Sequence, residues 1–308
     1  PHVRTPNLDR LARGGVIFEN LHVQFPTCMA SRASLLTGRY PAATRMANGS
    51  PFLDPRETTL AEVLQRAGYR TGMFGKLHLT PQLYTAKQLK SDRPIADARP
   101  FLPDTALWPI LEDPAKENYG FQEVVGFEDG LWGEYVEWLA DRDPISAGQL
   151  REEGRMGKSV FRRSFPDSFL RDVGTRPIAA QVHPSMFLAE SAAGFFQRHH
   201  AASPCFMHVS FVDPHHPFDP PAEVAETYDI ARMPLPKYGD TGEIPWPASI
   251  RDRMQNVAPA PNTLTADMIR TAVAYYYAMS EVIDRAVGKV LQAVEQAGEI
   301  ENTLFVFM

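Results

Sequence analysis

The chain has 308 residues, of which 44% are hydrophobic and 22% charged, with a formal net charge of −6. This is enough chain for one large α/β domain or two ordinary ones, and the acidic balance argues against a nucleic-acid partner. Apolar runs stay far below eighteen residues, so no membrane span is expected. The two cysteines, Cys28 and Cys205, cannot form a disulfide framework and lack the CxxC spacing of a metal site.

Charge is unevenly placed along the sequence. Residues 1–80 hold ten Lys and Arg against five Asp and Glu. Such a segment either attracts a small anion or is a solvated face with surplus arginine, and charge alone leaves both readings open. The chain opens at Pro1 instead of Met and closes on the apolar run Leu304–Met308, so both ends are expected to be cut. Cytoplasmic and periplasmic or secreted locations both stay open.

The first eighty residues alternate between helix and strand patterns. Thr5 and Pro6 predict a helix start, which Gly14 and Gly15 end, and an expected strand Val16–Phe18 follows. Further elements are expected as helices at 31–36 and 59–67 and a strand at 69–74. This alternation predicts an α/β fold with a mainly parallel sheet covered by helices on both faces.

The remaining chain divides into an irregular part and a regular part. Residues 81–183 lose a stable period, apart from a short helical piece at 132–139, and are interpreted as an insertion that shapes a pocket. After it we expect a helix at 184–199, a buried strand at 205–212, a Pro-rich loop at 214–261, an amphipathic helix at 265–297 and a strand at 304–308.

A cysteine stands just before a predicted helix start in the segment from Pro26 to Arg39. Free backbone N–H groups at that position favour negative charge, and Arg32 is four residues further along the helix. From physics alone Cys28 is a candidate nucleophile beside an anion site. A buried structural cysteine before a helix is the equally simple reading.

The segment Cys28–Arg39 resembles the sulfatase signature, with Ala30 where most members have Pro. In that family the cysteine is oxidised to formylglycine by a formylglycine-generating enzyme, and the hydrated aldehyde attacks sulfur. Two further segments resemble the family in the right order. They are the early helix at 5–12 and the element at 75–79, where Leu77 replaces the usual Trp.

Two groups of basic residues complete the expected site. Lys76 and His78 share one face of an extended segment, because successive side chains alternate. The alternative is a surface lysine and a satisfied turn histidine. His215 follows the strand at 205–212 and matches the family's His-x-Pro element. A metal site on His215 and His216 is a weaker reading, since adjacent side chains point apart.

The resemblance implies a fold, a reaction and partners. The fold is the alkaline-phosphatase-like sandwich, residues 1–308 being an incomplete catalytic domain. The reaction is hydrolysis of a small-molecule or saccharide sulfate ester. Arg32 orients the diol, Lys76 and His215 bind sulfate, His215 protonates the leaving alcohol, and His78 acts as base. The cofactor is Ca²⁺ or Mg²⁺, bound by residue 28 as formylglycine and by carboxylates outside this chain.

Two alternatives share these residues. A phosphonate monoester or phosphodiester hydrolase uses the same fold and nucleophile, although phosphodiesterase-like relatives tend to lack the pair formed by Lys76 and His78. A catalytically inactive relative would serve as a binding module. Modification of Cys28 separates the last reading from the other two.

Overall fold

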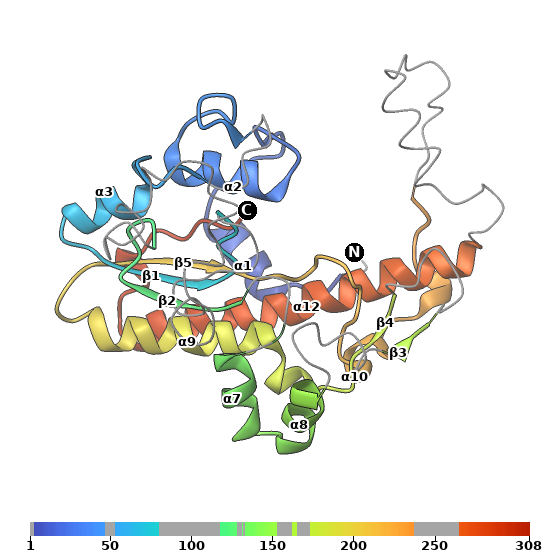
Figure 1. Ribbon diagram of the computed structural model, residues 1–308. Helices are drawn as coiled ribbons and strands as arrows, with labels where there is room; N and C mark the ends of the chain where they lie inside the picture. The colour runs from blue at the N-terminus through green and yellow to red at the C-terminus, as the bar shows by residue number, and fades with distance from the viewer. Residues whose placement is uncertain are drawn as a thin grey trace, which may run out of the picture.

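A three-stranded parallel sheet lies between two layers of helices (Figure 1). The computed structural model describes residues 3–46, 53–79, 118–127, 131, 133–152, 162–164, 173–236 and 265–308. The sheet has the order β2-β1-β5, with β1 at Arg70–Gly75, β2 at Glu123–Val125 and β5 at Cys205–Ser210. Both pairings are parallel. The predicted α/β class with a mainly parallel sheet is confirmed.

The central strand β1 is buried on both faces, as a strand between two helical layers must be. Met73 packs in the cluster on one side of the sheet, and its neighbour Phe74 packs in the cluster on the other. Phe74 meets Phe195 edge-on, with ring centroids 5.4 Å apart. Because successive side chains of β1 point to opposite faces of the sheet, this one strand packs against both helical layers.

One face of the sheet carries α2 (Cys28–Thr37) and α3 (Leu60–Arg66). Gly38 ends α2 in a left-handed conformation, as predicted. Thr59 caps α3 by accepting a hydrogen bond from the Glu62 backbone N–H. Small buried residues of both helices, including Ala30, Ala33 and Ala61, let them lie close to the sheet.

The opposite face carries α9 (Pro184–His199), and the long helix α12 (Ala266–Gln296) packs along it (Figure 1). These two helices match their predictions almost to the residue. The first helix, α1 (Pro6–Gly14), lies against α12. Within the described ranges, no helix combines the length and apolarity needed to cross a membrane.

Shorter elements surround this core. Helices α7 (Glu134–Ala140) and α8 (Pro144–Glu152) pack on α9, whereas β3 (Arg162–Arg163) and β4 (Gly174–Thr175) form a separate antiparallel pair. Short helical turns complete the described part, namely η6 (Ala180–Val182), α10 (Ala222–Ala225), η7 (Ile230–Arg232) and η9 (Ile300–Asn302). β2, α7 and α8 all fall within the expected insertion at 81–183, and β2 is part of the sheet itself.

The two expected strands at 16–18 and 304–308 are wrong. Both segments are irregular, and their large side chains are mostly exposed, with Val16 at 80% and Leu304 at 89%. A strand is stable only when its backbone groups pair with a neighbour. Among the described residues neither segment has such a partner, so apolar composition alone misled the prediction.

Candidate active site

The carboxyl ends of β1 and β5 meet at one edge of the sheet, with Gly75 directly opposite Ser210. A Cβ on Gly75 would stand 1.9 Å from the Ser210 carbonyl oxygen, and the Gly75 φ is +111°. Only glycine fits such an approach. The Lys76 N–H then donates to the same carbonyl at 2.9 Å. The segment after β1 is therefore held against the end of β5.

Cys28 is the first residue of α2 and is exposed. The helix begins three residues earlier than predicted, so Cys28 lies within its first turn. The Thr27 side chain makes no capping hydrogen bond, which leaves N–H groups of that turn directed out of the helix end. An exposed thiol beside such groups contradicts the reading of Cys28 as a buried structural cysteine.

Arg32 joins α2 to the edge of the sheet. Its Nη1 donates to the Lys76 carbonyl and to the Ser210 Oγ, each at 2.7 Å. One guanidinium nitrogen thus bridges the segments that follow β1 and end β5. The structure brings Arg32 to the backbone of Lys76, and the contact with Ser210 was not anticipated.

Lys76 and His78 follow β1 directly, and both side chains are buried, at 3% and 6% exposure. His78 has a positive φ of 49°, a conformation that costs energy in a residue other than glycine. The surrounding structure must hold it there. Their burial contradicts the reading of Lys76 as a surface lysine.

A further histidine, half-buried on β5, lies within the electrostatic influence of Arg32, and the sequence analysis missed it. His208 is on β5 on the same face as Ser210, and its ring lies 6.2 Å from that of Phe121. Burial and the positive charge of Arg32 lower the pKa of His208 to about 4. His208 is therefore neutral near pH 7. Its place two residues before Ser210, with strand alternation, was the available signal.

The His215 loop leaves the same edge of the sheet. His215 and His216 are exposed, and their rings stack with centroids 4.1 Å apart. The His215 Nδ1 lies 2.7 Å from the His216 carbonyl oxygen. A carbonyl only accepts hydrogen bonds, so Nδ1 carries the proton and Nε2 is the nitrogen left to meet a ligand. The stacked pair does not take the splayed arrangement expected of it.

Asp213 begins this loop and is held by two residues at the start of α9. The His183 Nε2 lies 3.4 Å from its Oδ2, and the Ser185 Oγ donates to the same oxygen at 3.4 Å. The His183 Nδ1 accepts from the Ser185 N–H, so the ring proton is on Nε2 and faces the carboxyl. Burial lowers the pKa of His183 to about 3, with a further contribution from Arg176.

Asp219 ends the loop and pairs with Arg176, whose Nε donates to its Oδ2 at 2.5 Å. Burial raises the pKa of Asp219 to about 7 against the opposing charge of Arg176, and Asp213 adds to the increase. Burial likewise raises the pKa of Asp213 to about 6. Asp219 is buried and Asp213 half-buried, and the charge of Arg176 opposes but does not outweigh this burial, so both carboxyls bind a proton more readily than isolated aspartates do.

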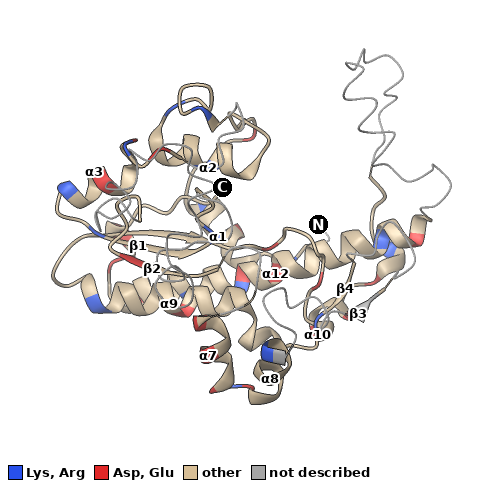
Figure 2. Cartoon of the chain, in the orientation of Figure 1, with Lys and Arg blue, Asp and Glu red and all other residues tan. Residues whose placement is uncertain are grey.

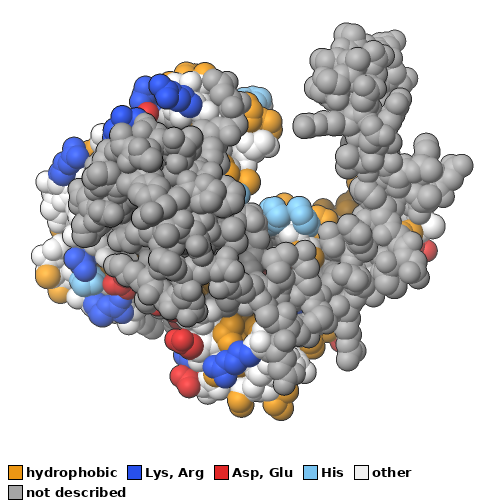
Figure 3. All heavy atoms as spheres, viewed as in Figure 1, with side chains coloured by type: hydrophobic (Ala, Val, Ile, Leu, Met, Phe, Trp, Pro, Cys, Tyr) orange, Lys and Arg blue, Asp and Glu red, His pale blue; other side chains and the backbone are white. Residues whose placement is uncertain are grey.

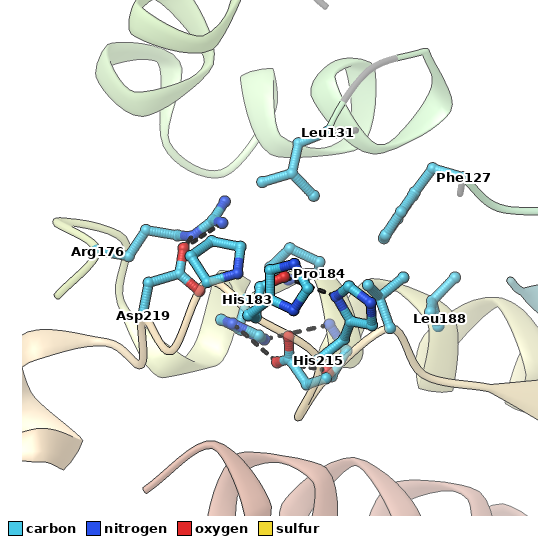
Figure 4. A pocket seen from close by; sticks show the side chains of 13 residues that line it. Phe127, Leu131, Arg176, His183, Pro184, Leu188, His215 and Asp219 are labelled. Atoms are coloured by element: carbon cyan, nitrogen blue, oxygen red, sulfur yellow. Dashed lines mark hydrogen bonds and ion pairs between the residues drawn. The ribbon is translucent and has the colours of Figure 1, made fainter. Parts of the chain in front are cut away.

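These groups line a cavity of about 40 Å³ beneath His215 (Figure 4). Figure 4 shows Arg176 and Asp219 directed toward one another, with His183 and His215 beside them. Apolar side chains close the other walls, namely Phe127, Leu131, Pro184, Leu188, Val212 and Pro217. In the space-filling view, histidine side chains are exposed at the surface next to the part that carries α2 (Figure 3).

Among the described residues, five basic side chains of the first eighty form ion pairs, and two of them, Arg4 and Arg10, pair with Glu281 and Glu295 beyond residue 80. Figure 2 shows Lys and Arg around α2 and α3 with acidic residues among them. The pairs there are Arg39–Glu57, Arg56–Asp54 and Arg66–Glu62. Arg32 and Lys76 instead lie at the sheet edge, so the sequence-wide surplus is no measure of an anion site.

Metal ligation was also expected. Among the residues that the structure describes, no group of three or more His, Cys, Asp or Glu side chains is arranged to hold a metal ion. The described residues therefore do not offer the oxygen-rich set that Ca²⁺ or Mg²⁺ requires.

Comparison with known sequences shows similarity along the entire chain. The profile of the family described as Sulfatase matches residues 1–308. An arylsulfatase of Clostridium perfringens is 25% identical over 316 residues, covering 99% of this chain and 57% of that protein. Human arylsulfatase A is 47% identical over 85 residues, or 26% of this chain and 17% of its own length. The chain spans a little over half the length of the relatives it matches throughout.

Solved structures share the fold. The phosphonate monoester hydrolase of Agrobacterium radiobacter superposes with a TM-score of 0.68 at 22% identity, covering 98% of this chain and 56% of the other. The putative sulfatase yidJ of Bacteroides fragilis superposes with a TM-score of 0.56 at 20% identity, over 98% and 56%. The sandwich is thus the alkaline-phosphatase-like one, as predicted.

Proposed function

The chain belongs to the sulfatase family, and from this premise we propose that the protein hydrolyses sulfate esters with a formylglycine made from Cys28. The observation that carries the proposal is the pair of hydrogen bonds from Arg32 to Lys76 and Ser210. Through them the helix that begins at Cys28 is fixed to the sheet edge from which Lys76, His78 and His215 follow.

Once formed, formylglycine would supply a hydrated aldehyde, whose hydroxyl forms a bond to sulfur as the bond to the ester oxygen breaks. Arg32, one helical turn after residue 28, would orient that hydroxyl and offset its charge. The Lys76 ammonium would hold a sulfate oxygen, because a buried cation attracts an anion more strongly than an exposed one does. These roles belong to side chains anchored at one sheet edge.

Two histidines would move protons in this scheme. As an imidazolium, His215 would give the proton of Nε2 to the departing alcohol and keep its Nδ1–H on the His216 carbonyl. Its exposure lets a substrate reach that nitrogen. His78 would accept a proton when sulfate is released. The general acid is thus assigned to an exposed loop and the base to a buried segment.

The proposal also includes a divalent cation, a sulfate ester substrate and a converting enzyme. Residue 28 is the one ligand to a divalent cation that we assign within this chain, and none of the proton transfers above depends on that cation. The substrate would be a small-molecule or saccharide sulfate ester. A formylglycine-generating enzyme would act on Cys28 before catalysis, and the exposure of the thiol at a helix start is compatible with access to it.

The test is the mass of the intact protein made with and without the converting enzyme. Co-expression should change the Cys28 peptide by the loss that accompanies conversion of a thiol to an aldehyde, and turnover of an aryl sulfate should rise with the converted fraction. Cys28→Ala should abolish turnover and leave the melting temperature unchanged, whereas Cys205→Ala should retain activity. Full activity in Cys28→Ala would rule out the formylglycine mechanism.

Phosphonate monoester hydrolysis is the second candidate, because the solved structure of such an enzyme has the same fold. Lys76 and His78 favour sulfate over a phosphonate ester. Matched aryl sulfate and aryl phenylphosphonate substrates, compared by kcat/KM on one preparation, would separate the candidates. A higher kcat/KM on the phosphonate would reverse the assignment.

A further inference from the structure

The loop that carries His215 is fixed at both ends by aspartate side chains, the half-buried Asp213 and the buried Asp219. Upstream, Asp213 lies three residues after the end of β5 and contacts His183 and Ser185. Downstream, Asp219 pairs with Arg176. All three partners come from the segment that runs through β4 and η6 into the start of α9. Both ends of the loop are therefore anchored to one neighbouring segment.

Backbone pairing strengthens the downstream anchor. The Gly174 N–H donates to the Phe218 carbonyl and the Arg176 N–H donates to the Pro220 carbonyl, each at 3.0 Å. The Ala222 N–H returns a hydrogen bond to the Arg176 carbonyl at 3.3 Å. Arg176 thus holds the end of the loop through its side chain and its backbone, 43 residues away in sequence.

The loop residues that remain between the anchors have little freedom of their own. The His215 N–H donates to the Val212 carbonyl at 3.1 Å, which closes a turn, and the His215 ring is fixed by the His216 carbonyl and by stacking. Burial raises the pKa of the Asp213 carboxyl, and the charge of His215 is among the groups that oppose this, so the carboxyl lies near the ring. Movement of either anchor would therefore be transmitted to the imidazole.

We propose that Asp213 and Asp219, held by His183 and Arg176, are positioning residues that fix the His215 imidazole for proton transfer to the leaving alcohol. The proposal rests on the proposed function, in which His215 is the general acid. Removing a carboxylate from water costs free energy that removing an apolar side chain does not. At the two ends of this loop the carboxylates instead hold in place the segment that bears the general acid.

The first test is a double-mutant cycle between residues 213 and 215 in the intact, converted protein. His215→Gln should lower kcat by about 10²–10⁴-fold on alkyl sulfates and far less on activated aryl sulfates, which leave without a proton. Asp213→Asn should show the same leaving-group pattern with a smaller loss. In the His215→Gln background, Asp213→Asn should change kcat less than about threefold, because residues that act as a unit are not additive. Equal losses in both backgrounds would overturn the proposal.

A second test does not depend on turnover. In the intact protein labelled with ¹⁵N-histidine, the ring signals of His215 are assigned with His215→Gln. Asp213→Asn should shift and broaden these signals and leave those of His199 and His200 in place. Unmoved His215 signals would overturn the positioning role. If the signals respond while no sulfate ester is hydrolysed, the proposed function fails and the anchoring stands.

Matched variants separate positioning from lost stability. Ser185→Ala removes one of the two donors to Asp213 and serves if Asp213→Asn does not fold. Asp284→Asn replaces another buried carboxylate, one that anchors α1 instead of this loop. It should lower the melting temperature without moving the His215 signals. A His215 response to Asp284→Asn equal to that of Asp213→Asn would also overturn the proposal.

Discussion

Asp284, within α12, accepts hydrogen bonds from the backbone N–H groups of Asn7 and Leu8, at 3.2 and 2.8 Å. The residues are 277 and 276 positions apart in sequence. The Asn7 Nδ2 also donates to the Asp284 carboxylate at 2.8 Å. A buried negative charge thus caps the first turn of α1, where the helix dipole favours it. This contact gives a structural reason for the sequence pattern at residues 5–12.

Asp284→Asn is expected to destabilise the protein by about 1–3 kcal/mol, since a charged acceptor of several hydrogen bonds becomes a neutral amide. Urea unfolding of the intact protein measures the loss. Gly288→Ala should act on the same contact, because its Cβ would stand 2.7 Å from the Asn7 side chain. Unchanged stability in both variants would show that α1 does not depend on this attachment.

Gly75→Ala is expected to cost more than about 3 kcal/mol, since the new Cβ would overlap the Ser210 carbonyl as well as strain the backbone. Gly68→Ala is the control. Gly68 has a φ of +90°, but open space surrounds its Cβ position, so only the conformational cost of about 1–2 kcal/mol should appear. Equal unfolding free energies for the two variants would contradict the predicted steric term.

Ser210→Ala is expected to lower kcat about 5–30-fold, because Arg32 loses one of its two described acceptors and its orientation toward residue 28 loosens. Ser210→Thr keeps the hydroxyl and should recover most of the rate. Ser191→Ala removes a hydroxyl that bonds only within α9 and should leave kcat unchanged. Wild-type kcat in Ser210→Ala would mean that the Ser210 hydroxyl does not position Arg32.

The side-chain carboxyls of Asp213 and Asp219 predict that the free energy of unfolding changes with pH. The pKa values of Asp213 and Asp219, about 6 and 7, lie above the ordinary 3.8, so the folded state binds more protons than the unfolded state between these values. Their contribution to stability is complete below about pH 4 and is lost as pH rises through 6 to 7. Asp213→Asn stays uncharged throughout. Its melting temperature minus that of the parent should therefore increase from pH 5 to pH 8, and parallel curves would contradict the shift for Asp213.

Helices with clear end signals were predicted well from the sequence. Pro184 fixes the start of α9, and the long apolar stripe of α12 sets its extent up to the Gly298 turn. The start of α2 was set three residues late, although Thr27 is a residue type that favours the cap position, and its side chain makes no capping hydrogen bond. Local sequence signals thus explain the correctly predicted bounds of α9 and α12, whereas the signal at Thr27 was missed at the start of α2.

Contacts between distant segments could not be predicted. Nothing near Arg176 or His183 in sequence indicates Asp219 or Asp213 as partners, since the contacts depend on how β5 and α9 pack. β2 is only three residues long, too short for a period, yet it pairs with β1. The residues around Cys28, Lys76, His78 and His215 were recognised through family resemblance, whereas His208 and Ser210 required the strand register.

β1 and β5 run parallel and in register from Arg70 opposite Cys205 to Gly75 opposite Ser210. Their amino ends therefore lie together at one edge of the sheet, and their carboxyl ends, which lead to the candidate site, lie together at the other. The turn at 201–203, before β5, is exposed at Ala201 and Ala202 and lies a strand's length from Ser210. A fluorophore or affinity tag attached there should report on the protein without approaching the end of β5 from which the His215 loop leaves. The edge of the sheet after Gly75 does not tolerate an insertion, because one inserted residue would turn Lys76 away from its present face.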